Sequence, residues 1–415
     1  MTKEKVIPQI RFSGFTDTWE QHKLGDHSEI VAGGTPNTGH PEYWNPKEIP
    51  WMSSGEINNK VIYSTDNMIS KIGFSNSSAK WVKEKSVLIA LAGQGKTRGT
   101  VAISEIPLTT NQSIAAIQPD SFLYYKFLFQ NLEERYNELR EVSSGDGTRG
   151  GLNKQIISDL EVLAPEIQEQ IKIGDFLCGI DTLITLHQRK YDKLTKVKKA
   201  MLEKMFPENG SPYPEIRFKG FTDAWEQRKF SELTEIRSAS RVHKEEWQSS
   251  GVPFYRSSDV MAALNGTENE KAFISEELYE KLSAVSGKLE KGDILVTGGG
   301  SVGKPYIVPN NEPLYTKDAD LLWVKNNEKL VPYFIYTFFF SPAFSDYLNS
   351  VSHVGTIAHY TITQLEETPI TLPCVSEQQK IGDYFRNIDS LITLHQRKLE
   401  KLKNIKKACL EKMFV

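Results

Sequence analysis

The chain has 415 residues, of which 39% are hydrophobic and 25% are charged. This is ordinary globular composition, and the length allows two or more domains. The formal net charge of −3 at pH 7 excludes a protein that holds nucleic acid by an overall basic surface, so any contact with DNA must come from local clusters of Lys and Arg.

The cysteine content and the hydropathy pattern narrow the class further. Cys178, Cys374 and Cys409 have no cysteine at the matching positions of the repeat described below, which argues against disulfides and against a cysteine-based metal site. No apolar run follows Met1, so we expect no signal peptide, and the longest apolar run, 333–340, is too short to span a bilayer. We therefore expect a soluble, cytoplasmic protein.

The first body of the chain, from about Trp19 to Leu163, is predicted to be a β-rich domain with one helix. A mixed aromatic and charged segment, 122–141, predicts that helix, which ends before a turn-rich loop at 143–147. Short β-branched and apolar runs predict strands at 49–52, 87–91, 100–103 and 114–117.

The next segment, 165–206, is predicted to form one long helix behind a proline. Its apolar residues recur at alternating steps of four and three, which gives a narrow stripe of period 3.5. Such a stripe favours a partner helix over a broad core. The residues of this seam are Ile173, Leu177, Ile180, Ile184, His187, Tyr191 and Leu194.

After a Pro- and Gly-rich linker at 207–213, which is predicted to be extended and exposed, the sequence starts again. Residues 8–21 return as 214–227, and the long helix returns as 373–414, where LITLHQRK and LEKMF recur letter for letter. The obvious partner of each helix is therefore the other copy. The second seam comprises Ile381, Phe385, Ile388, Ile392, His395, Leu399 and Leu402.

Polar residues at matched places in the two seams are predicted to fix pairing rather than to catalyse. His187 and His395 recur without a recurring nucleophile or carboxylate, and buried polar residues in a seam set register. Lys198 and Lys406 fit the same interpretation, or they extend their charged ends to solvent.

The second body, from about Trp225 to Leu372, diverges in sequence but keeps the layout of the first. A strand at 293–297 with its glycine loop corresponds to 87–99, a helix is predicted at 331–348, and Gly355-Thr356 corresponds to Gly147-Thr148. Two bodies of one fold with different surfaces suggest two binding specificities.

These patterns predict an α+β protein in which two globular domains of mixed, β-rich fold are separated by two long helices packed as an antiparallel coiled coil. The predicted boundaries are 1–164 for the first domain, 165–206 for the first helix, 207–213 for the linker, 214–372 for the second domain and 373–415 for the second helix.

Two glycine-rich loops are the strongest candidates for a binding site. The segment Gly298–Lys304 fits G-x-x-x-x-G-K, but Pro305 and a strand follow where a nucleotide loop needs Ser or Thr and a helix. The matching loop carries Lys96, Thr97 and Arg98. Glycines let backbone amides approach phosphates and cations neutralise them, so both loops are candidate DNA contacts; the alternative is a strand–turn–strand corner with solvated charges.

Polar residues behind apolar strands are weaker candidates for reading base edges, and helix caps are an equally good interpretation of them. These residues are Ser53, Ser54, Lys60, Asn111, Gln112, Arg149, Arg256, Ser257 and Ser258. We find no H-E-x-x-H, no G-x-S-x-G and no paired metal-ligand spacing, so the motifs point away from an enzyme.

At this point the layout resembles one family across nearly the full length of the chain: the specificity subunit of Type I restriction–modification systems. The second body departs from the pattern, with Tyr360-Thr-Ile in place of Leu-Asn-Lys and Phe230-Ser-Glu in place of Leu-Gly-Asp. The segments that carry the resemblance are the Trp19-Glu-Gln…Leu24-Gly-Asp opening, the loop that ends at Lys96–Gly99, Gly151-Leu-Asn-Lys, and Pro165…Glu169-Gln leading into Ile180-Asp-Thr-Leu-Ile.

The resemblance implies that each domain reads one half of an asymmetric, bipartite sequence in double-stranded DNA and that the helices act as a ruler. It also implies partners: two modification subunits that use S-adenosylmethionine to methylate adenine, and restriction subunits that use ATP and Mg. This chain itself would carry neither a cofactor nor catalysis. Two rivals stay open, a P-loop-like nucleotide-binding enzyme using Gly298–Lys304 and a coiled-coil scaffold without a DNA role.

Overall fold

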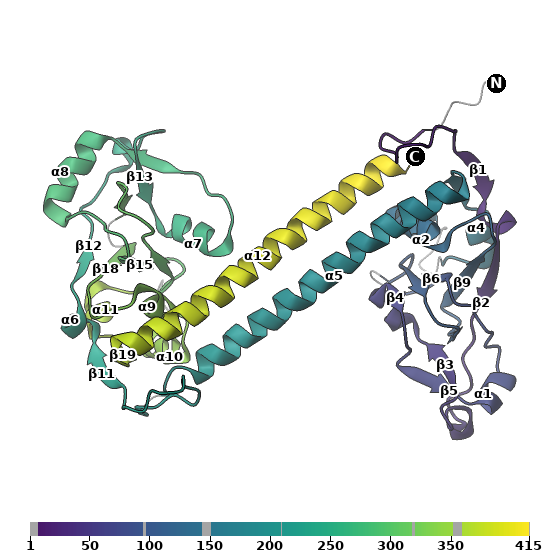
Figure 1. The fold of residues 1–415 in the computed structure, drawn as a ribbon, viewed down its shortest axis with the longest axis horizontal. Coiled ribbons are helices and arrows are strands. Elements are labelled where there is room, and N and C mark those ends of the chain that lie inside the picture. Colours follow the sequence, from purple (N-terminus) through teal and green to yellow (C-terminus); the bar gives the residue numbers. More distant parts are fainter. Residues whose placement is uncertain are drawn as a thin grey trace. The chain divides into compact units, whose positions relative to one another are not determined.

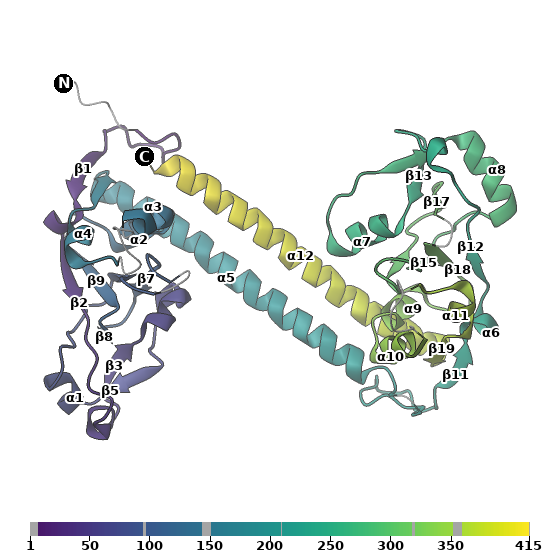
Figure 2. The same cartoon turned by 180° about the vertical axis from the view of Figure 1, so that it is seen from behind.

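The computed structural model describes residues 7–93, 97–142, 151–208, 210–317, 320–351 and 359–414. The chain divides into two compact units (Figures 1 and 2). Unit 1 comprises Met1–His187 together with Lys398–Val415, and unit 2 comprises Gln188–Arg397. Two long helices, α5 (Ile167–Lys204) and α12 (Val375–Met413), therefore each begin in one unit and end in the other.

The described residues of unit 1 form three sheets. Its strands are β1 (Glu20–Lys23), β2 (Ser28–Ala32), β3 (Ile49–Met52), β4 (Val61–Ile62), β5 (Asn67–Ile69), β6 (Ser86–Ala90), β7 (Val101–Ser104), β8 (Thr109–Thr110), β9 (Ile114–Pro119) and β10 (Glu161–Ala164). The largest sheet has the order β2-β9-β6-β7-β4 and is antiparallel except where β4 joins β7. In the sheet β5-β3-β8, β3 is antiparallel to β5 and parallel to β8, and β1 pairs with β10.

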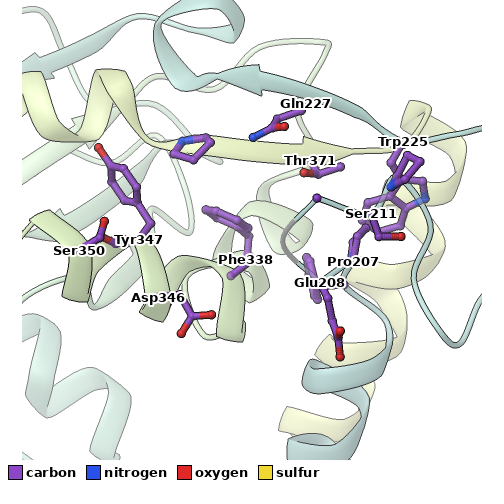
Figure 3. A pocket seen from close by; sticks show the side chains of 15 residues that line it. Pro207, Glu208, Ser211, Trp225, Gln227, Phe338, Asp346, Tyr347, Ser350 and Thr371 are labelled. Carbon is purple, nitrogen blue, oxygen red and sulfur yellow. The ribbon is translucent and has the colours of Figure 1, made fainter.

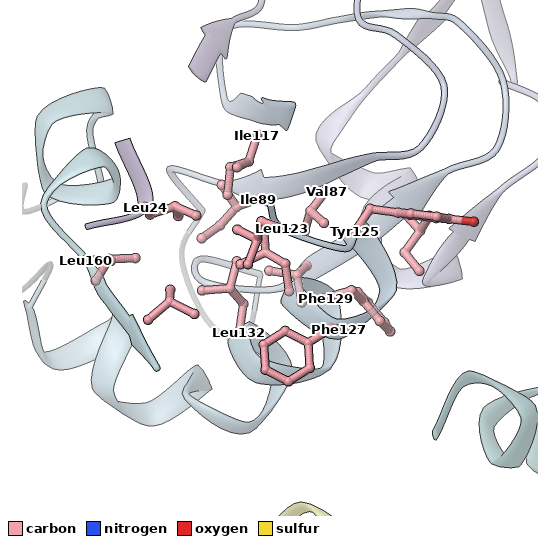
Figure 4. Close-up of a cluster of buried hydrophobic side chains, with 14 of the residues drawn as sticks. Leu24, Val87, Ile89, Ile117, Leu123, Tyr125, Phe127, Phe129, Leu132 and Leu160 are labelled. Carbon is pink, nitrogen blue, oxygen red and sulfur yellow. The ribbon is translucent and has the colours of Figure 1, made fainter. Parts of the chain in front are cut away.

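Apolar cores cover both faces of the largest sheet of unit 1. Val87 and Ile89 of β6 belong to the core that includes α2 (Tyr125–Glu134), whereas Leu88 and Ala90 belong to the core on the other face. Successive side chains of a strand point to opposite faces, so all of β6 is buried. Figure 4 shows Val87 and Ile89 among the α2 side chains. The remaining helices of unit 1 are α1 (Lys71–Ser75), α3 (Tyr136–Val142), α4 (Lys154–Ser158), and the 3-10 turns η1 (Leu24–Asp26), η2 (Pro41–Tyr43) and η3 (Ser54–Asn59).

Unit 2 repeats this plan. Its strands are β11 (Glu226–Lys229), β12 (Ile236–Ser238), β13 (Val252–Tyr255), β14 (Ala272–Ile274), β15 (Ile294–Thr297), β16 (Pro305–Ile307), β17 (Tyr315–Thr316), β18 (Leu321–Val324) and β19 (Pro369–Leu372). The sheet β12-β18-β15-β16 matches β2-β9-β6-β7, and β14-β13-β17 matches β5-β3-β8 with the same parallel and antiparallel pairs. The pair β11-β19 matches β1-β10.

The helices of unit 2 differ more from those of unit 1 than the sheets do. The 3-10 turn after β3 is replaced by α7 (Ser257–Asn265), and α8 (Glu276–Ser286) follows β14. The remaining helices are α6 (Phe230–Leu233), α9 (Pro332–Phe338), α10 (Pro342–Val351), α11 (Ile362–Glu367) and the 3-10 turn η4 (Lys244–Glu246).

Most of the predicted strands and both long helices are confirmed within a residue or two at each end, but the two predicted domain helices are wrong as single elements. The segment 122–141 forms α2 and α3, which are separated by the cap residue Arg135, whose guanidinium donates to the Glu161 carbonyl. The segment 331–348 forms α9 and α10, because Pro342 has no N–H and cannot continue a helix. The linker is exposed in part: Pro207 is buried, whereas Gly210 and Tyr213 are exposed. Both Gly-Thr pairs, at 147–148 and 355–356, lie outside the described residues.

Candidate nucleic-acid interface and helix junctions

The glycine loop of unit 1 closes the hairpin between β6 and β7. Ala90 and Thr100 pair across its base, with 3.0 Å between the Ala90 nitrogen and the Thr100 oxygen, and the Gly99 nitrogen donates to the Ala90 oxygen. Gly99 has a φ of 83°, a conformation that favours glycine. Thr97 and Arg98 lie on this turn, half-buried, and Lys96 lies outside the described residues.

The glycine loop of unit 2 has the same place, between the antiparallel strands β15 and β16. Its base is closed by the Thr297 nitrogen donating to the Lys304 oxygen at 3.0 Å and by the Gly303 nitrogen donating to the Thr297 oxygen at 2.7 Å. Gly303 has a φ of 75°, and a Cβ there would lie 2.8 Å from the Phe344 ring. A strand follows the loop directly, so the helix N-terminus that a P-loop uses to bind phosphate is not formed by this segment, and the P-loop alternative is wrong.

On the glycine loop of unit 2, Lys304 is the residue that is predicted to contact DNA. Its ammonium lies 5.9 Å from the centre of the Phe340 ring, and in the described part of the chain no carboxylate lies within ion-pair distance of it. A half-buried cation held on an aromatic ring and lacking a carboxylate partner suits a phosphate contact.

The polar residues that follow β3 and β13 form the cap positions and first turns of η3 and α7. Ser53 caps η3, with its backbone nitrogen 2.8 Å from the Glu56 carboxylate. Arg256 is the residue before the first turn of α7, and its backbone nitrogen donates to Asp259 Oδ2 at 2.8 Å. Ser54 is the first residue of η3, Ser257 Oγ donates to the Asp320 carbonyl, and Ser258 Oγ accepts from Asn269.

The other predicted DNA contacts of unit 1 are scattered. Asn111 Oδ1 accepts from the Ser113 nitrogen at 3.1 Å, and Gln112 accepts from the Thr35 hydroxyl. Lys60 lies beside α2 and α5, where it pairs with Glu133 of α2 and lies 3.9 Å from Asp181 of α5. Burial alone would lower the pKa of Lys60, but Glu133 and Asp181 raise it, so its charge is already matched. Arg149 lies outside the described residues.

Within each unit, part of the predicted helix seam lies in a core that both long helices help to form, and the burial of the seam residues is graded. Ile173, Leu177 and Ile180 of α5 lie in one core with Leu410 and Met413 of α12. In unit 2, Ile381 and Phe385 of α12 lie in one core with Met205 and Phe206. Among the remaining seam residues, Ile388 and Leu399 are buried, and Ile184, His187, Tyr191, Leu194, Ile392, His395 and Leu402 are half-buried.

The start of each long helix is anchored by a contact that the sequence reasoning missed. Arg11 donates from Nε and Nη2 to the two carboxylate oxygens of Glu169 at 2.7 and 2.8 Å, and the Glu169 side chain is fully buried. Arg217 binds Glu377 in unit 2 with the same two distances. The hydrogen bonds to Glu169 raise the pKa of Arg11. The arginine and the glutamate both lie at matched positions in the two repeats, and this recurrence could have revealed the ion pair from the sequence.

The end of each long helix is anchored by aromatic rings. Phe414, beyond the end of α12, lies against Trp19 and Phe127, with ring centres 6.3 and 5.2 Å away. In unit 2 Phe206, beyond the end of α5, lies 6.2 Å from Trp225 and 5.4 Å from Phe334. The LEKMF repeat thus provides the same anchor twice.

The helices also expose apolar side chains. Leu183 and Leu186 of α5 are each 45% exposed, and Leu391 and Leu394 of α12, at the matched positions, are 44% and 45% exposed. These four leucines, called the outer leucines below, come from the LITL repeat. Recurrence of exposed large apolar residues on both helices marks them as candidate contacts for other proteins.

A pocket of about 500 Å³ in unit 2 lies where the chain leaves α5 (Figure 3). Its described lining includes two charged side chains, Glu208 and Asp346, and both are carboxylates. Such a lining repels phosphate groups, so this pocket gives no support to a nucleotide site. No group of three or more His, Cys, Asp or Glu residues able to hold a metal occurs among the residues that the structure describes. Within the same ranges, every helix is too short or too polar to cross a bilayer.

Comparison with known proteins gives a consistent picture. A family model described as the Type I restriction modification DNA specificity domain matches residues 16–196 and again 222–404. The specificity subunit of the Type I restriction enzyme MjaIX from Methanocaldococcus jannaschii is 27% identical over 421 aligned residues, covering 95% of this chain and 92% of that protein. The EcoR124I/EcoR124II specificity subunit from Escherichia coli is 24% identical over 186 residues, covering 42% of this chain and 46% of that protein.

Among solved structures, the crystal structure of the Type I restriction–modification S subunit from M. genitalium aligns with a TM-score of 0.64 and 12% sequence identity. The alignment covers 99% of each chain. At this identity the likeness concerns the fold.

Proposed function

The chain belongs to the Type I restriction modification DNA specificity domain family, and on that premise we propose that it is the DNA-recognition subunit of a Type I restriction–modification complex. Each β-rich domain reads one half of an asymmetric, bipartite DNA site, and the two long helices set the distance between the half-sites. The subunit directs adenine methylation or restriction without catalysing either reaction.

One observation supports this proposal above the others. The contacts that join the long helices to the domains, and the sheet order, are repeated in both units (the repeated frame), whereas the residues around the glycine loops are not. The two units share the arginine–glutamate anchor, the aromatic anchor and the sheet order, but differ in the helices and polar residues around their glycine loops. A repeated frame holding two different surfaces is what a reader of an asymmetric sequence requires. α5 has 38 residues, which corresponds to about 57 Å at 1.5 Å per residue and exceeds one turn of DNA, about 34 Å.

The partners and cofactors follow from the same premise. Two modification subunits bind S-adenosylmethionine and dock on the long helices. We assign to these contacts the outer leucines of each unit separately: Leu183 and Leu186 in unit 1, and Leu391 and Leu394 in unit 2. Restriction subunits, which use ATP and Mg, join this core complex. A cytoplasmic location fits these partners and the DNA substrate.

The two rival functions have less support. A nucleotide-binding enzyme lacks a loop of the required geometry at Gly298–Lys304. A coiled-coil scaffold without a DNA role would not need two domains that diverge in sequence on one repeated frame. A gel shift with the modification subunit present separates the scaffold from the DNA reader.

The decisive experiment is a domain exchange in the assembled complex. Residues 19–163 are replaced by the corresponding body of another such subunit, and adenine methylation is mapped by single-molecule sequencing in cells. One half of the methylated sequence should change, while the other half and the spacer remain. A change in both halves would show that the domains do not read independently.

A second experiment addresses the glycine loop of unit 1. The double variant Lys96→Ala/Arg98→Ala should weaken DNA binding and reduce the dependence of affinity on salt by ~2 in log–log slope, because each phosphate contact releases about one counterion. The matched control is Lys80→Ala/Lys83→Ala, which removes the same charge from exposed positions elsewhere in unit 1. Equal effects from both variants, or none from either, would assign the loop cations to solvent.

A further inference from the structure

Each long helix carries, at matched positions, an aspartate and a lysine that form ion pairs with the other long helix. These are Asp181 and Lys198 in α5 and Asp389 and Lys406 in α12, seventeen residues apart in both helices. In unit 1 the Lys406 ammonium lies 2.6 Å from Asp181 Oδ1, and in unit 2 the Lys198 ammonium lies 2.6 Å from Asp389 Oδ1. Each aspartate therefore pairs with the lysine of the other helix.

The pair in unit 1 is deeply set and tied to the domain. The Lys406 side chain is 9% exposed, and its ammonium also lies 2.5 Å from Glu133 Oε2 of α2. Gln130 of α2 donates to Asp181 Oδ2 at 2.8 Å. Burial alone would raise the pKa of Glu133, but Lys406 and Lys60 lower it by more than burial raises it. The net effect lowers the pKa and keeps this carboxylate charged.

The pair in unit 2 is more open and uses aromatic neighbours. The Tyr333 hydroxyl of α9 donates to Asp389 Oδ2 at 2.9 Å. The Lys198 ammonium lies 5.1 Å from the centre of the Phe340 ring, which Lys304 of the glycine loop also approaches. Lys198 and Asp389 line a groove of about 1090 Å³ and keep 22% and 21% of their side chains exposed.

The apolar seam alone does not fix the alignment of the two helices. Its pattern recurs every seven residues, so a shift of one heptad again matches apolar residues with apolar residues. The ion pairs do not recur in this way. In both contacts the residue numbers of the partners add to 587, as one antiparallel register requires.

A shift of seven residues in either direction leaves every charge without its partner. Opposite Lys406 would stand Gly174 or Gln188, and opposite Lys198 would stand Gly382 or Gln396. The aspartates would face apolar or aromatic side chains: Leu399 or Met413 for Asp181, and Tyr191 or Met205 for Asp389. An unpaired charge in such surroundings is strongly disfavoured.

We infer that the Asp181–Lys406 and Asp389–Lys198 pairs are register determinants within the helix pair, acting together with the aromatic anchors at the helix ends, and so help to fix the spacing between the two DNA half-sites. This inference rests on the proposed function. A slip of one heptad corresponds to ~10 Å of helix, or about three base pairs at 3.4 Å each. The four residues are positioning residues that touch no base.

The test uses the full chain with its modification subunits and three variants of the more open pair: Lys198→Asp, Asp389→Lys and both together. The single variants place two like charges at the contact, whereas the double variant restores an ion pair with reversed polarity. The control is Lys199→Asp, an exposed neighbour with no ion pair among the described residues. Methylation is mapped genome-wide and scored by half-site sequence and by spacer length.

Each single variant should lower methylation at the wild-type spacer on the order of tenfold, with new sites at altered spacers and unchanged half-sites. The double variant should return most of the wild-type level, and Lys199→Asp should match wild type. Single variants that keep the spacer and level, or a double variant no better than the singles, would overturn the inference. If the singles fail to fold, recovery in the double variant decides alone.

Failure of the proposed function is seen separately. If the wild-type chain directs no bipartite methylation, the function is wrong, and the pairing is then tested by thermal unfolding of the purified full chain. The double variant should still be more stable than either single variant, and a double variant whose midpoint shift is the sum of the two single shifts would overturn the pairing itself.

Discussion

Two glycines in α5 provide a direct test of how closely the helix packs on the domain of unit 1. A Cβ added to Gly174 would lie 2.7 Å from the Phe127 nitrogen and 3.0 Å from the Lys126 carbonyl carbon, both in the backbone of α2. A Cβ added to Gly179, five residues later in the same helix, would meet nothing within 4 Å. The variants Gly174→Ala and Gly179→Ala therefore differ in crowding but share the same gain in helix propensity.

The expected magnitudes follow from two opposing terms. Replacing glycine by alanine inside a helix stabilises by about 1 kcal/mol. Crowding against a backbone that cannot rotate away costs roughly 1–3 kcal/mol. Gly179→Ala should thus stabilise by up to about 1 kcal/mol, and Gly174→Ala should be neutral or destabilise by up to about 2 kcal/mol. Gly382→Ala, whose Cβ would lie 3.1 Å from the Phe334 nitrogen of α9, should fall between them.

Thermal unfolding of the full chain measures this order. For units of this size, 1 kcal/mol shifts the midpoint by about 2–4 °C, so the first two variants should be separated by several degrees in the transition that reports unit 1. Equal stabilisation by Gly174→Ala and Gly179→Ala would refute the close approach of α5 to α2. A large loss in Gly179→Ala would refute its exposure.

Three further predictions concern separate parts of the chain. Arg11→Ala leaves the carboxylate of Glu169 buried without its partner and should cost about 3–5 kcal/mol of stability, measured by denaturant unfolding; a loss below ~1 kcal/mol would contradict a buried pair. Burial raises the pKa of the Cys178 thiol to about 11, so a thiol reagent at pH 8 should modify the exposed Cys374 first and Cys178 only on unfolding, and equal rates would contradict this. A chain that ends at Phe206 should pair with a second copy of itself through the repeated seam and, with modification subunits, direct methylation to an inverted repeat; a monomer at high concentration, or an asymmetric methylated site, would show that the two helices are not equivalent.

The sequence predicted the features that repeat with a period, and the reason is physical. The seam from Ile173 to Leu194 and its copy follow from helix geometry alone, because apolar residues that recur every 3.5 positions indicate a helix that packs against another helix. The strand at 87–91 is equally clear, since β6 is buried on both faces and reads as an unbroken apolar run. Helix breaks were harder to find. Pro342 marked one in the sequence, whereas the break at Arg135 depends on a carbonyl of β10 that is distant in the chain.

The predicted DNA contacts could not be resolved in the same way, because a polar residue after a strand has two uses with the same local signature. Ser53 and Arg256 precede acidic residues at the spacing of a helix cap, and the structure places both at the cap position. Lys60 looked like a loop cation, yet its partners Glu133 and Asp181 come from two other elements. Its pairing is a property of the folded unit and leaves no trace near position 60.

Comparison of the two repeats distinguishes residues that hold a long helix on a domain from residues that are candidates for reading DNA, and it does so better than any local motif. Residues that anchor the start of a long helix recur in both halves in identity and in geometry: Arg11 with Arg217, and Glu169 with Glu377. Residues around the glycine loops keep their place but not their identity: Thr100 and Lys304 hold the same position at the base of their loops. A contact that only holds the frame must be the same twice, because both domains dock on the same helix pair. A contact that reads DNA must differ, because an asymmetric site presents a different surface to each domain. Divergence within a repeated frame is therefore the feature by which further base-reading residues of this chain can be sought.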